Sequence, residues 1–233
     1  MRSSIPSDMT SGFTEQAKTL GACLAGITSI ASLKHSPSYK FYGRPKWPGK
    51  AKSVLILALA HEVSAPALDW WDNKGGGSPG NRRLEEMANT LKQWLRKEFN
   101  LNAQPLPYQV RRGGIFLKDA AALAGLGVIG KNNLLITREY GPRVRLRALF
   151  LDVDLESTGP IRFNPCEDCD MPCRQACPQH AFRDGSYRKI ICHVQMRKDE
   201  ASGVLLEETE EYDLPMRVVK YCRACELTCP VAR

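Results

Sequence analysis

The sequence of 233 residues has no long apolar run, since its longest one, residues 54–60, is the length of a single strand. A membrane-spanning helix needs ~20 predominantly apolar residues, so we expect no transmembrane segment and no membrane partner. Residues 1–12 are polar and lack the apolar core of a secretory signal peptide. The lack of both features predicts a cytoplasmic protein.

Cysteine is nearly absent from the first 165 residues, where Cys23 is the single example. The total of nine cysteines is odd, and thiols in a reducing compartment stay reduced. Both points argue against a disulfide framework. We expect Cys23 to be a small core residue on an N-terminal helix.

The other eight cysteines are concentrated in the last 68 residues. They form the runs Cys166-x-x-Cys169-x-x-x-Cys173-x-x-x-Cys177-Pro178 and Cys222-x-x-Cys225-x-x-x-Cys229-Pro230, with Cys192 between them. Eight thiolates are the number that two 4Fe-4S clusters require. The spacing therefore predicts a protein that moves electrons one at a time.

The wiring of two-cluster ferredoxins assigns these cysteines to two sets. In such proteins the first three cysteines of a run bind one cluster, and the fourth, before proline, ligates the other. This predicts a first cysteine set of Cys166, Cys169, Cys173 and Cys229. It predicts a second cysteine set of Cys177, Cys192, Cys222 and Cys225. Three residues separate Cys169 from Cys173, where the bacterial run has two, so we expect a bulge around Met171-Pro172.

Structural zinc and buried free thiols are the alternatives to clusters. Zinc sites use tetrads of Cys and His at C-x₂₋₄-C spacing and do not call for two Cys-Pro runs. We expect His180 and His193 to lie near the clusters or at the surface rather than to act as ligands.

The formal net charge of +8 treats every cysteine as neutral. Each 4Fe-4S(2+) cluster with four thiolates carries about −2, so two clusters bring the protein to roughly +4. That balance gives only weak support for an anionic partner such as a nucleic acid or a phosphate-bearing cofactor.

Hydrophobic periodicity before residue 155 predicts helices and strands, whereas cysteine, proline and charge dominate afterwards. We expect an α+β protein with an α/β cofactor-binding domain over residues 1–158 and a two-cluster domain over residues 159–233. The predicted helices are 13–25, 82–99 and 117–126; the predicted strands are 53–60, 134–137 and 144–153, with 108–116 extended. Proline and glycine predict loops at 36–50 and 73–81.

Gly125, Gly127 and Gly130 match the G-x-G-x-x-G dinucleotide pattern, but a predicted helix precedes them where a strand is required. We therefore do not expect nicotinamide binding. Glycines at a helix exit still let the backbone approach a large flat ligand closely.

Two groups of arginines flank this stretch. Arg143, Arg145 and Arg147 alternate on a predicted strand and so share one face, which predicts a solvated face or, alternatively, a contact surface for phosphate or for the cysteine-rich domain. The pair Arg111-Arg112 precedes two glycines and could meet an anionic group through bidentate hydrogen bonds.

These motifs together resemble a known superfamily. The stretch AGLGVIGKNNLLIT at 124–137, the stretch YGPRVRL at 140–146 and the double cysteine run resemble the epoxyqueuosine reductases and reductive dehalogenases. Val128 stands where the epoxyqueuosine reductase pattern has Trp, and EYGPRVRL at 139–146 is closer to the dehalogenases. The resemblance covers residues from about 15 to 230.

The resemblance implies a nitroreductase-like α/β domain that binds cobalamin base-off, beside a ferredoxin-like double 4Fe-4S module that feeds electrons to cobalt. It also implies reductive removal of oxygen or halogen from a substrate. By this resemblance the residues expected to contact the corrin are Gly125, Gly127, Gly130, Asn132, Asn133 and Arg143.

The chain departs from the family pattern in two respects. Epoxyqueuosine reductases carry an acid ahead of the glycine motif, where this chain has Arg111-Arg112. The helical-repeat region that this family uses for tRNA is not found after Cys229. Both departures disfavour epoxyqueuosine as the substrate and nucleic acid as a partner. Dehalogenases use a Tyr with a nearby Lys or Arg as proton donor, and Tyr108 with Arg111 or Arg112 is the possible analogue, although dehalogenases are typically longer and exported.

Two functional hypotheses follow from the sequence. The first is a reductase that passes electrons from an external low-potential donor through two clusters to a cobamide, and that acts on a small molecule. The second is an electron-transfer protein that reduces the cofactor of a partner corrinoid protein.

Overall fold

The computed structural model describes residues 7–43, 47, 49–72, 74, 77–206 and 216–232. The chain forms two compact units, each built from three separate stretches. The sheet unit comprises Met1–Leu59, Leu84–Val128 and Leu146–Phe163. The cysteine unit comprises Ala60–Arg83, Ile129–Arg145 and Asn164–Arg233. The units alternate along the chain, and the domain boundary between residues 158 and 159 stays a prediction.

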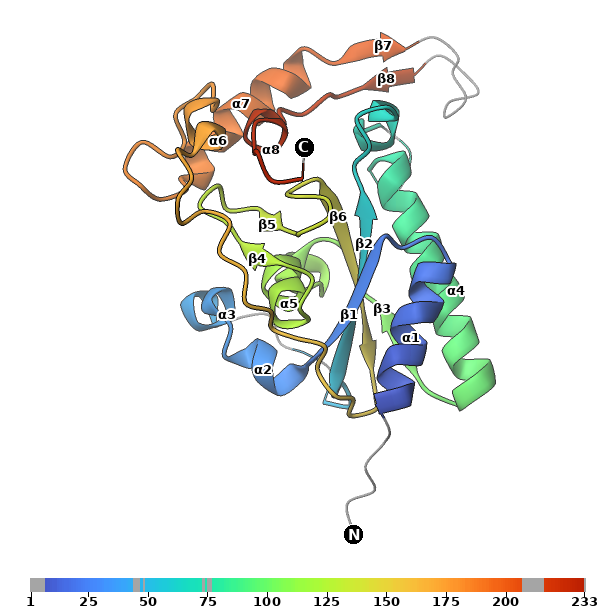
Figure 1. Ribbon diagram of the computed structural model, residues 1–233. Helices are drawn as coiled ribbons and strands as arrows, with labels where there is room; N and C mark the ends of the chain where they lie inside the picture. Colours follow the sequence, from blue (N-terminus) through green and yellow to red (C-terminus); the bar gives the residue numbers. More distant parts are fainter. Residues whose placement is uncertain are drawn as a thin grey trace. The chain divides into compact units, whose positions relative to one another are not determined.

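A four-stranded sheet in the order β1-β2-β6-β3 forms the centre of the sheet unit (Figure 1). Its strands are β1 (Leu24–Ser29), β2 (Ser53–Ala60), β6 (Val144–Leu151) and β3 (Ala103–Pro105). β1 is antiparallel to β2, with Gly26 opposite Ile56, and β3 is antiparallel to β6, with Gln104 opposite Phe150. Residues 53–58 are buried, as expected for a central strand covered on both faces.

The main core lies where α1 (Ser7–Thr19) and α4 (Pro79–Phe99) pack on one face of this sheet (Figure 1). Leu55 and Leu57 point to this face because side chains alternate along a strand. They belong to the same buried cluster as Phe13 of α1 and Leu91 of α4. Full burial of each such side chain contributes about 1.5–3 kcal/mol, so this layer stabilises the sheet unit.

A second group of helices lies on the other side of β1 from α1 (Figure 1). α2 (Ile30–Lys34) and α5 (Leu117–Leu123) both contact β1 and each other. A Cβ atom at Gly26 would lie 2.5 Å from the carbonyl oxygen of Ala124, which directly follows α5. The absence of a side chain at Gly26 therefore allows the end of α5 to approach β1.

The cysteine unit contains short elements joined by long loops (Figure 1). They are the 3₁₀ helix η1 (Pro66–Asp69), β5 (Leu135–Ile136), α6 (Pro172–Gln175), α7 (Lys189–Ala201), β7 (Val204–Leu206), β8 (Met216–Val218) and α8 (Ala224–Leu227). β5 pairs with β4 (Val128–Ile129), β7 is antiparallel to β8, and α6 contacts α8. Among the described residues, no helix combines the length and apolar character needed to cross a bilayer.

The long periodic segments agree with prediction. β2 matches the predicted strand 53–60, β6 lies within the predicted strand 144–153, and α4 contains the predicted helix 82–99. α5 is confirmed but ends at Leu123, and β5 is a short part of the predicted strand 134–137.

Several predicted element boundaries were wrong, because local glycine and proline conformations set where these elements begin and end. The helix predicted over 13–25 ends at Thr19, since Gly21 adopts φ +105, so Cys23 follows the helix and Gly26 lies in β1. The predicted loop 36–50 contains the helix α3 (Pro37–Tyr42), which has Pro37 in its first turn. Residues 44–46 and 48 lie outside the described residues.

Two further segments also differ from prediction. The segment 108–116 was predicted to be extended, but it contains the 3₁₀ helix η2 (Val110–Arg112), which ends at Gly113 with φ +96. The predicted loop 73–81 overlaps the start of α4 at Pro79, and its residues 73, 75 and 76 lie outside the described residues. The side chain of Ser78 accepts a hydrogen bond of 3.3 Å from the Asn81 amide and so caps α4.

Candidate metal centres

The seven cysteines of the two runs and Cys192 are all free thiols in the cysteine unit. Cys173 lies in α6, Cys192 in α7 and Cys225 in α8, whereas the other five lie on loops. Cys173 and Cys229 are buried, and Cys222 is the exposed member of the eight. The short helices α6 and α8 thus carry one thiol of each run.

Members of the first cysteine set act on each other electrostatically. Burial raises the pKa of the Cys173 thiol, and the neighbouring thiols of Cys229, Cys166 and Cys169 raise it further. Burial also raises the pKa of Cys229, again with contributions from Cys166 and Cys169. The fourth member, which is distant in sequence, is therefore a spatial neighbour of the other three.

The second cysteine set behaves in the same way. Burial raises the pKa of Cys225 to about 12, with further contributions from Cys222, Cys192 and Cys177. Burial raises the pKa of Cys222 as well, and Cys177 and Cys192 add to the shift. Thiols with such pKa values are protonated near neutral pH, so a bound metal must displace their protons.

Each cysteine set offers four thiols as potential metal ligands. Among the described residues, no three His, Cys, Asp or Glu side chains converge on a point where one metal ion could be held. A four-coordinate zinc ion requires such convergence. In a 4Fe-4S cluster each of the four thiolates binds a different iron, so the sulfur atoms stand apart around the cluster. Each cysteine set has the four thiols that one such cluster requires.

The loops around the thiols have unusual backbone conformations. Met171 adopts φ +54 directly before Pro172 begins α6, at the position where the longer spacing predicts a bulge. Its amide donates a 3.4 Å hydrogen bond to Cys169 Sγ. Both Cys-Pro motifs place their fourth residue in the left-handed region, His180 with φ +52 and Ala232 with φ +54. The two motifs therefore share the Cys-Pro pair and a left-handed residue two positions after the proline.

Hydrogen bonds to sulfur are the protein's means of stabilising charge on a cluster. The amide of Ala181 donates a 3.3 Å hydrogen bond to Cys177 Sγ. The pKa of the half-buried Tyr187 is raised by burial and by a side-chain hydrogen bond with Cys192, with Cys225 and Cys177 adding to the shift. Both sulfur atoms that receive these contacts belong to the second cysteine set.

The stretch 129–145 holds the cysteine loops in place. Asn132 is buried, donates a 3.4 Å hydrogen bond to the Cys225 carbonyl and accepts one from the Leu134 amide. Arg143 donates a hydrogen bond to the Ala232 carbonyl, just after the second Cys-Pro motif. Arg174 donates a 3.0 Å hydrogen bond to the Lys131 carbonyl. These contacts connect the stretch to the loops of both cysteine sets.

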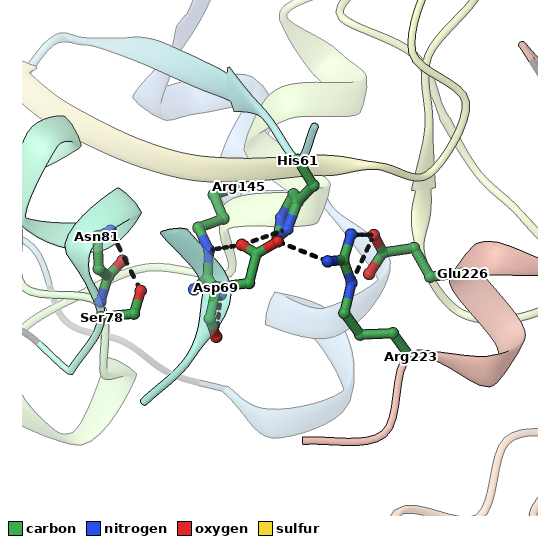
Figure 2. A network of polar contacts seen from close by, with 7 residues as sticks. All are labelled: His61, Asp69, Ser78, Asn81, Arg145, Arg223 and Glu226. Atoms are coloured by element: carbon green, nitrogen blue, oxygen red, sulfur yellow. Dashed lines mark hydrogen bonds and ion pairs between the residues drawn. The ribbon is translucent and has the colours of Figure 1, made fainter. Parts of the chain in front are cut away.

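A buried polar network accompanies the second cysteine set (Figure 2). The Asp69 side chain is 4% exposed, and its carboxylate accepts hydrogen bonds from Arg145 Nε at 2.7 Å and Arg223 Nη1 at 2.6 Å. His61 Nδ1 lies 2.5 Å from the same carboxylate. Arg223 also binds Glu226.

The charge state of Asp69 follows from this network. Burial alone would raise the pKa of its carboxyl group. The contacts with His61 and Arg145 outweigh burial and lower the pKa below its usual value of 3.8. Asp69 is therefore an anion that joins the end of β2, the start of β6 and the loop between Cys222 and Cys225.

Comparison with known proteins agrees with the resemblance seen in the sequence. No family model matches the chain. An epoxyqueuosine reductase from Lactococcus garvieae is 32% identical over 64% of the chain, and one from Gloeobacter violaceus is 28% identical over 93%. A tetrachloroethene reductive dehalogenase from Desulfitobacterium hafniense is 37% identical over 71% of the chain. The crystal structure of a selenomethionine-labelled epoxyqueuosine reductase matches 97% of the chain with a TM-score of 0.67 at 21% identity.

The chain belongs to the superfamily of epoxyqueuosine reductases and reductive dehalogenases. Its mixed helix-and-sheet fold is the one found in epoxyqueuosine reductase structures. This superfamily member matches 39% of the length of the Lactococcus protein, 67% of the Gloeobacter protein and 29% of the dehalogenase. One similar structure holds an epoxyqueuosine-modified tRNA stem loop, and another concerns B12-dependent dehalogenation.

Packing explains two of the glycines that the superfamily resemblance assigns to the corrin. A Cβ at Gly125, which has φ +78, would lie 2.9 Å from the Thr158 carbonyl oxygen. A Cβ at Gly130 would lie 2.2 Å from Ile136 Cδ1. Gly127 is buried. The stretch follows the helix α5, which agrees with the rejection of a dinucleotide site.

The other predicted residues of this superfamily member fall in different environments. Tyr108 is 49% exposed, and Arg111 and Arg112 are exposed on η2 of the sheet unit. Asn133 adopts φ +60 in the cysteine unit. The corrin-contact and proton-donor roles of these residues stay predictions.

The solvated-face interpretation of the three alternating arginines was wrong. Arg147 is 4% exposed, with Nη1 donating a 3.3 Å hydrogen bond to the Leu106 carbonyl. Arg145 binds Asp69, and Arg143 binds the chain beyond Cys229. The contact of Arg143 with Ala232 agrees with the alternative that these arginines meet the cysteine-rich domain, whereas Arg145 binds Asp69 outside it. Asp69 and His61 were missed because no local motif marks an isolated carboxylate or histidine.

Proposed function

We propose that this chain is an iron–sulfur reductase that holds two 4Fe-4S clusters, one in each cysteine set. The observation that carries the proposal is the spacing of the eight cysteines in the two Cys-Pro runs with Cys192 between them. In agreement with it, the shifted thiol pKa values have other members of the same set among their causes. A bound 4Fe-4S cluster exchanges one electron at a time at low potential. The reductases among the chain's relatives support the same reaction class.

The protein's own groups would hold and tune the clusters. The eight thiolates would bind iron, and the amides of Met171 and Ala181 would stabilise charge on two of the sulfurs. Asn132 and Arg143 would fix the loops that carry Cys225 and Cys229. Asn132 and Arg143 would thus position cluster ligands, in addition to making the corrin contact that the family resemblance assigns to them.

We also propose that the chain binds a cobamide, which would supply reductive removal of oxygen or halogen. The similar structure described for B12-dependent dehalogenation supports this part. The candidate contacts are Gly125, Gly127, Gly130, Asn132, Asn133 and Arg143. Tyr108, Arg111 and Arg112 stay the candidates for supplying a proton or holding an anionic substrate group.

Epoxyqueuosine in tRNA is the first substrate to test. The sequence disfavoured nucleic acid, but relatives that carry the name epoxyqueuosine reductase, one of them solved with a tRNA stem loop, conflict with that prediction. The exposed Arg111 and Arg112 suit contacts with phosphate. Arg111 and Arg112 stand where epoxyqueuosine reductases have their acid. If this chain reduces epoxyqueuosine, we therefore expect a residue at another position to supply the proton.

The deciding experiment is anaerobic purification followed by analysis of iron, sulfide and cobalt. We expect about eight irons and, after incubation with cobalamin, about one cobalt per chain. About four irons or fewer after reconstitution would refute the two-cluster proposal. Eight irons with no change in the cob(II)alamin spectrum on titration would refute the cobamide part.

The second candidate function is an electron-transfer protein without its own substrate. The replacement of the family's acid by Arg111-Arg112 favours it. Incubation of the reduced, loaded protein with epoxyqueuosine-modified tRNA distinguishes the two. Conversion to queuosine supports the reductase, whereas no conversion, together with reduction of cobalamin on a separate corrinoid protein, supports the alternative.

A further inference from the structure

The segment 60–83 of the cysteine unit contacts the chain immediately around Cys222. Trp71 forms an isolated antiparallel bridge with Val219, with backbone hydrogen bonds of 3.0 and 2.7 Å. The Trp71 ring meets the Tyr221 ring edge to face, with centroids 5.8 Å apart. Lys220 Nζ lies 3.9 Å from the centre of the Trp70 ring, which is a cation–π contact. Three consecutive residues before Cys222 are therefore held by two tryptophans.

Asp69 continues these contacts past Cys222. Its Oδ2 accepts a 2.6 Å hydrogen bond from Nη1 of Arg223, which lies between the predicted ligands Cys222 and Cys225 (Figure 2). Both side chains are largely buried, with 4% exposure for Asp69 and 19% for Arg223. Two residues separated by 154 positions in the chain thus meet as a charged pair next to a cluster loop.

Arg223 has two anionic partners with different roles. Glu226 binds its Nε and Nη2 atoms from within the same loop and helix, at a separation of three residues. Asp69, by contrast, joins Arg223 to a distant part of the chain. Asp69 is itself fixed by Arg145, whose Nη2 also reaches the Asp69 carbonyl at 3.2 Å. The carboxylate is therefore a rigid anchor rather than a mobile surface charge.

We infer that Asp69 is a positioning residue for the cluster of the second cysteine set. It fixes the Cys222-x-x-Cys225 loop through Arg223, and it balances the positive charge of Arg223 beside the cluster. This inference rests on the proposed function, since it assumes that the second cysteine set holds a 4Fe-4S cluster. It assigns to segment 60–83 a role in electron transfer, although this segment contains no cysteine.

The test compares Asp69→Asn with Asp72→Asn in the reconstituted full-length protein. Asp72 is a matched control because it lies in the same segment and pairs through both oxygens with Arg82, at 2.9 and 2.8 Å, rather than with Arg223. Midpoint potentials of both clusters are measured by redox titration followed by electron paramagnetic resonance, and iron is counted in parallel.

Removal of a negative charge next to a cluster favours its reduced form. For Asp69→Asn we expect the ratio of reduced to oxidised cluster at a fixed potential to rise about tenfold for one cluster, which is about 59 mV for a one-electron couple. The other cluster should be unchanged, and Asp72→Asn should leave both unchanged. Loss of about four irons in Asp69→Asn alone would also support the inference, because the anchor of one ligand loop is then required.

Equal behaviour of Asp69→Asn and Asp72→Asn, or no change in either, would overturn the inference. Arg223→Gln should have the opposite effect. Loss of its positive charge should lower the ratio of reduced to oxidised form for the same cluster. Hydrogen exchange over residues 216–226 is measured for the same variants and does not depend on iron. Faster exchange in Asp69→Asn than in Asp72→Asn supports the anchor, and equal exchange refutes it. A wild-type protein without clusters would instead refute the proposed function.

Discussion

Removal of Cys225 and Cys229, alone and together, tests the assignment of the two cysteine sets most directly. These residues are four positions apart at the end of the second run. Their thiols nevertheless respond to different neighbours, Cys225 to the second cysteine set and Cys229 to the first. Two consecutive cysteines of one run should therefore bind different clusters.

The iron content follows from this assignment by simple counting. With four irons per cluster, the wild-type protein should hold ~8 irons, and Cys225→Ala or Cys229→Ala should each hold ~4. The double variant should hold almost none, because each substitution removes a ligand from a different cluster. Cys23→Ala lies outside both sets and should keep ~8 irons.

The assay is anaerobic reconstitution, followed by iron and sulfide analysis and by electron paramagnetic resonance of the reduced protein. The two single variants should lose different resonance signals. A double variant that keeps ~4 irons would mean that both cysteines serve one cluster, and this result would refute the assignment.

Three further predictions concern packing, pH and potential. Gly26→Ala should lower the free energy of unfolding, measured in urea, by about 1–3 kcal/mol, because the added Cβ would lie 2.5 Å from a carbonyl oxygen. The control Gly12→Ala in α1 has open space around the added Cβ and should be neutral or stabilising. The metal-free protein should lose stability as pH rises from about 9 toward 12, since Cys225 has a pKa raised from 9.0 to about 12 and the folded state favours its protonated form. The unfolding midpoint of metal-free Cys225→Ala should fall less over that range, and equal slopes would contradict the reasoning. Tyr187→Phe removes the hydrogen bond with Cys192 and should lower the midpoint potential of one cluster in a redox titration, and an unchanged potential would count against that hydrogen bond.

Sequence periodicity was sufficient for the long elements of the sheet unit. The apolar run of β2 and the regular spacing in α4 predicted both elements, because burial against a core imposes those patterns. Local turn chemistry was harder to anticipate. The N-terminal helix ends near Gly21 rather than Gly26, and only the packing of α5 against β1 explains the second glycine.

The cysteine motifs predicted a set of candidate ligands but not the residues that support them. Asp69 and Arg223 meet across 154 positions, and neither lies in a motif that indicates the other. The same holds for Asn132 and the Cys225 carbonyl. Such contacts depend on how the three stretches of the cysteine unit come together, which one sequence without its fold does not reveal.

The interleaving of the two units also has a consequence for the order of synthesis. Residues 60–83 leave the ribosome long before their partners at 219–223, so Asp69 must wait for Arg223 while two further stretches of the sheet unit are synthesised. Contacts between residues so far apart in the sequence form slowly, because the entropic cost of closing the loop comes before the contact stabilises the fold. Nascent chains should therefore expose an unfinished cysteine unit until translation has passed Cys229, the last cysteine of the first cysteine set.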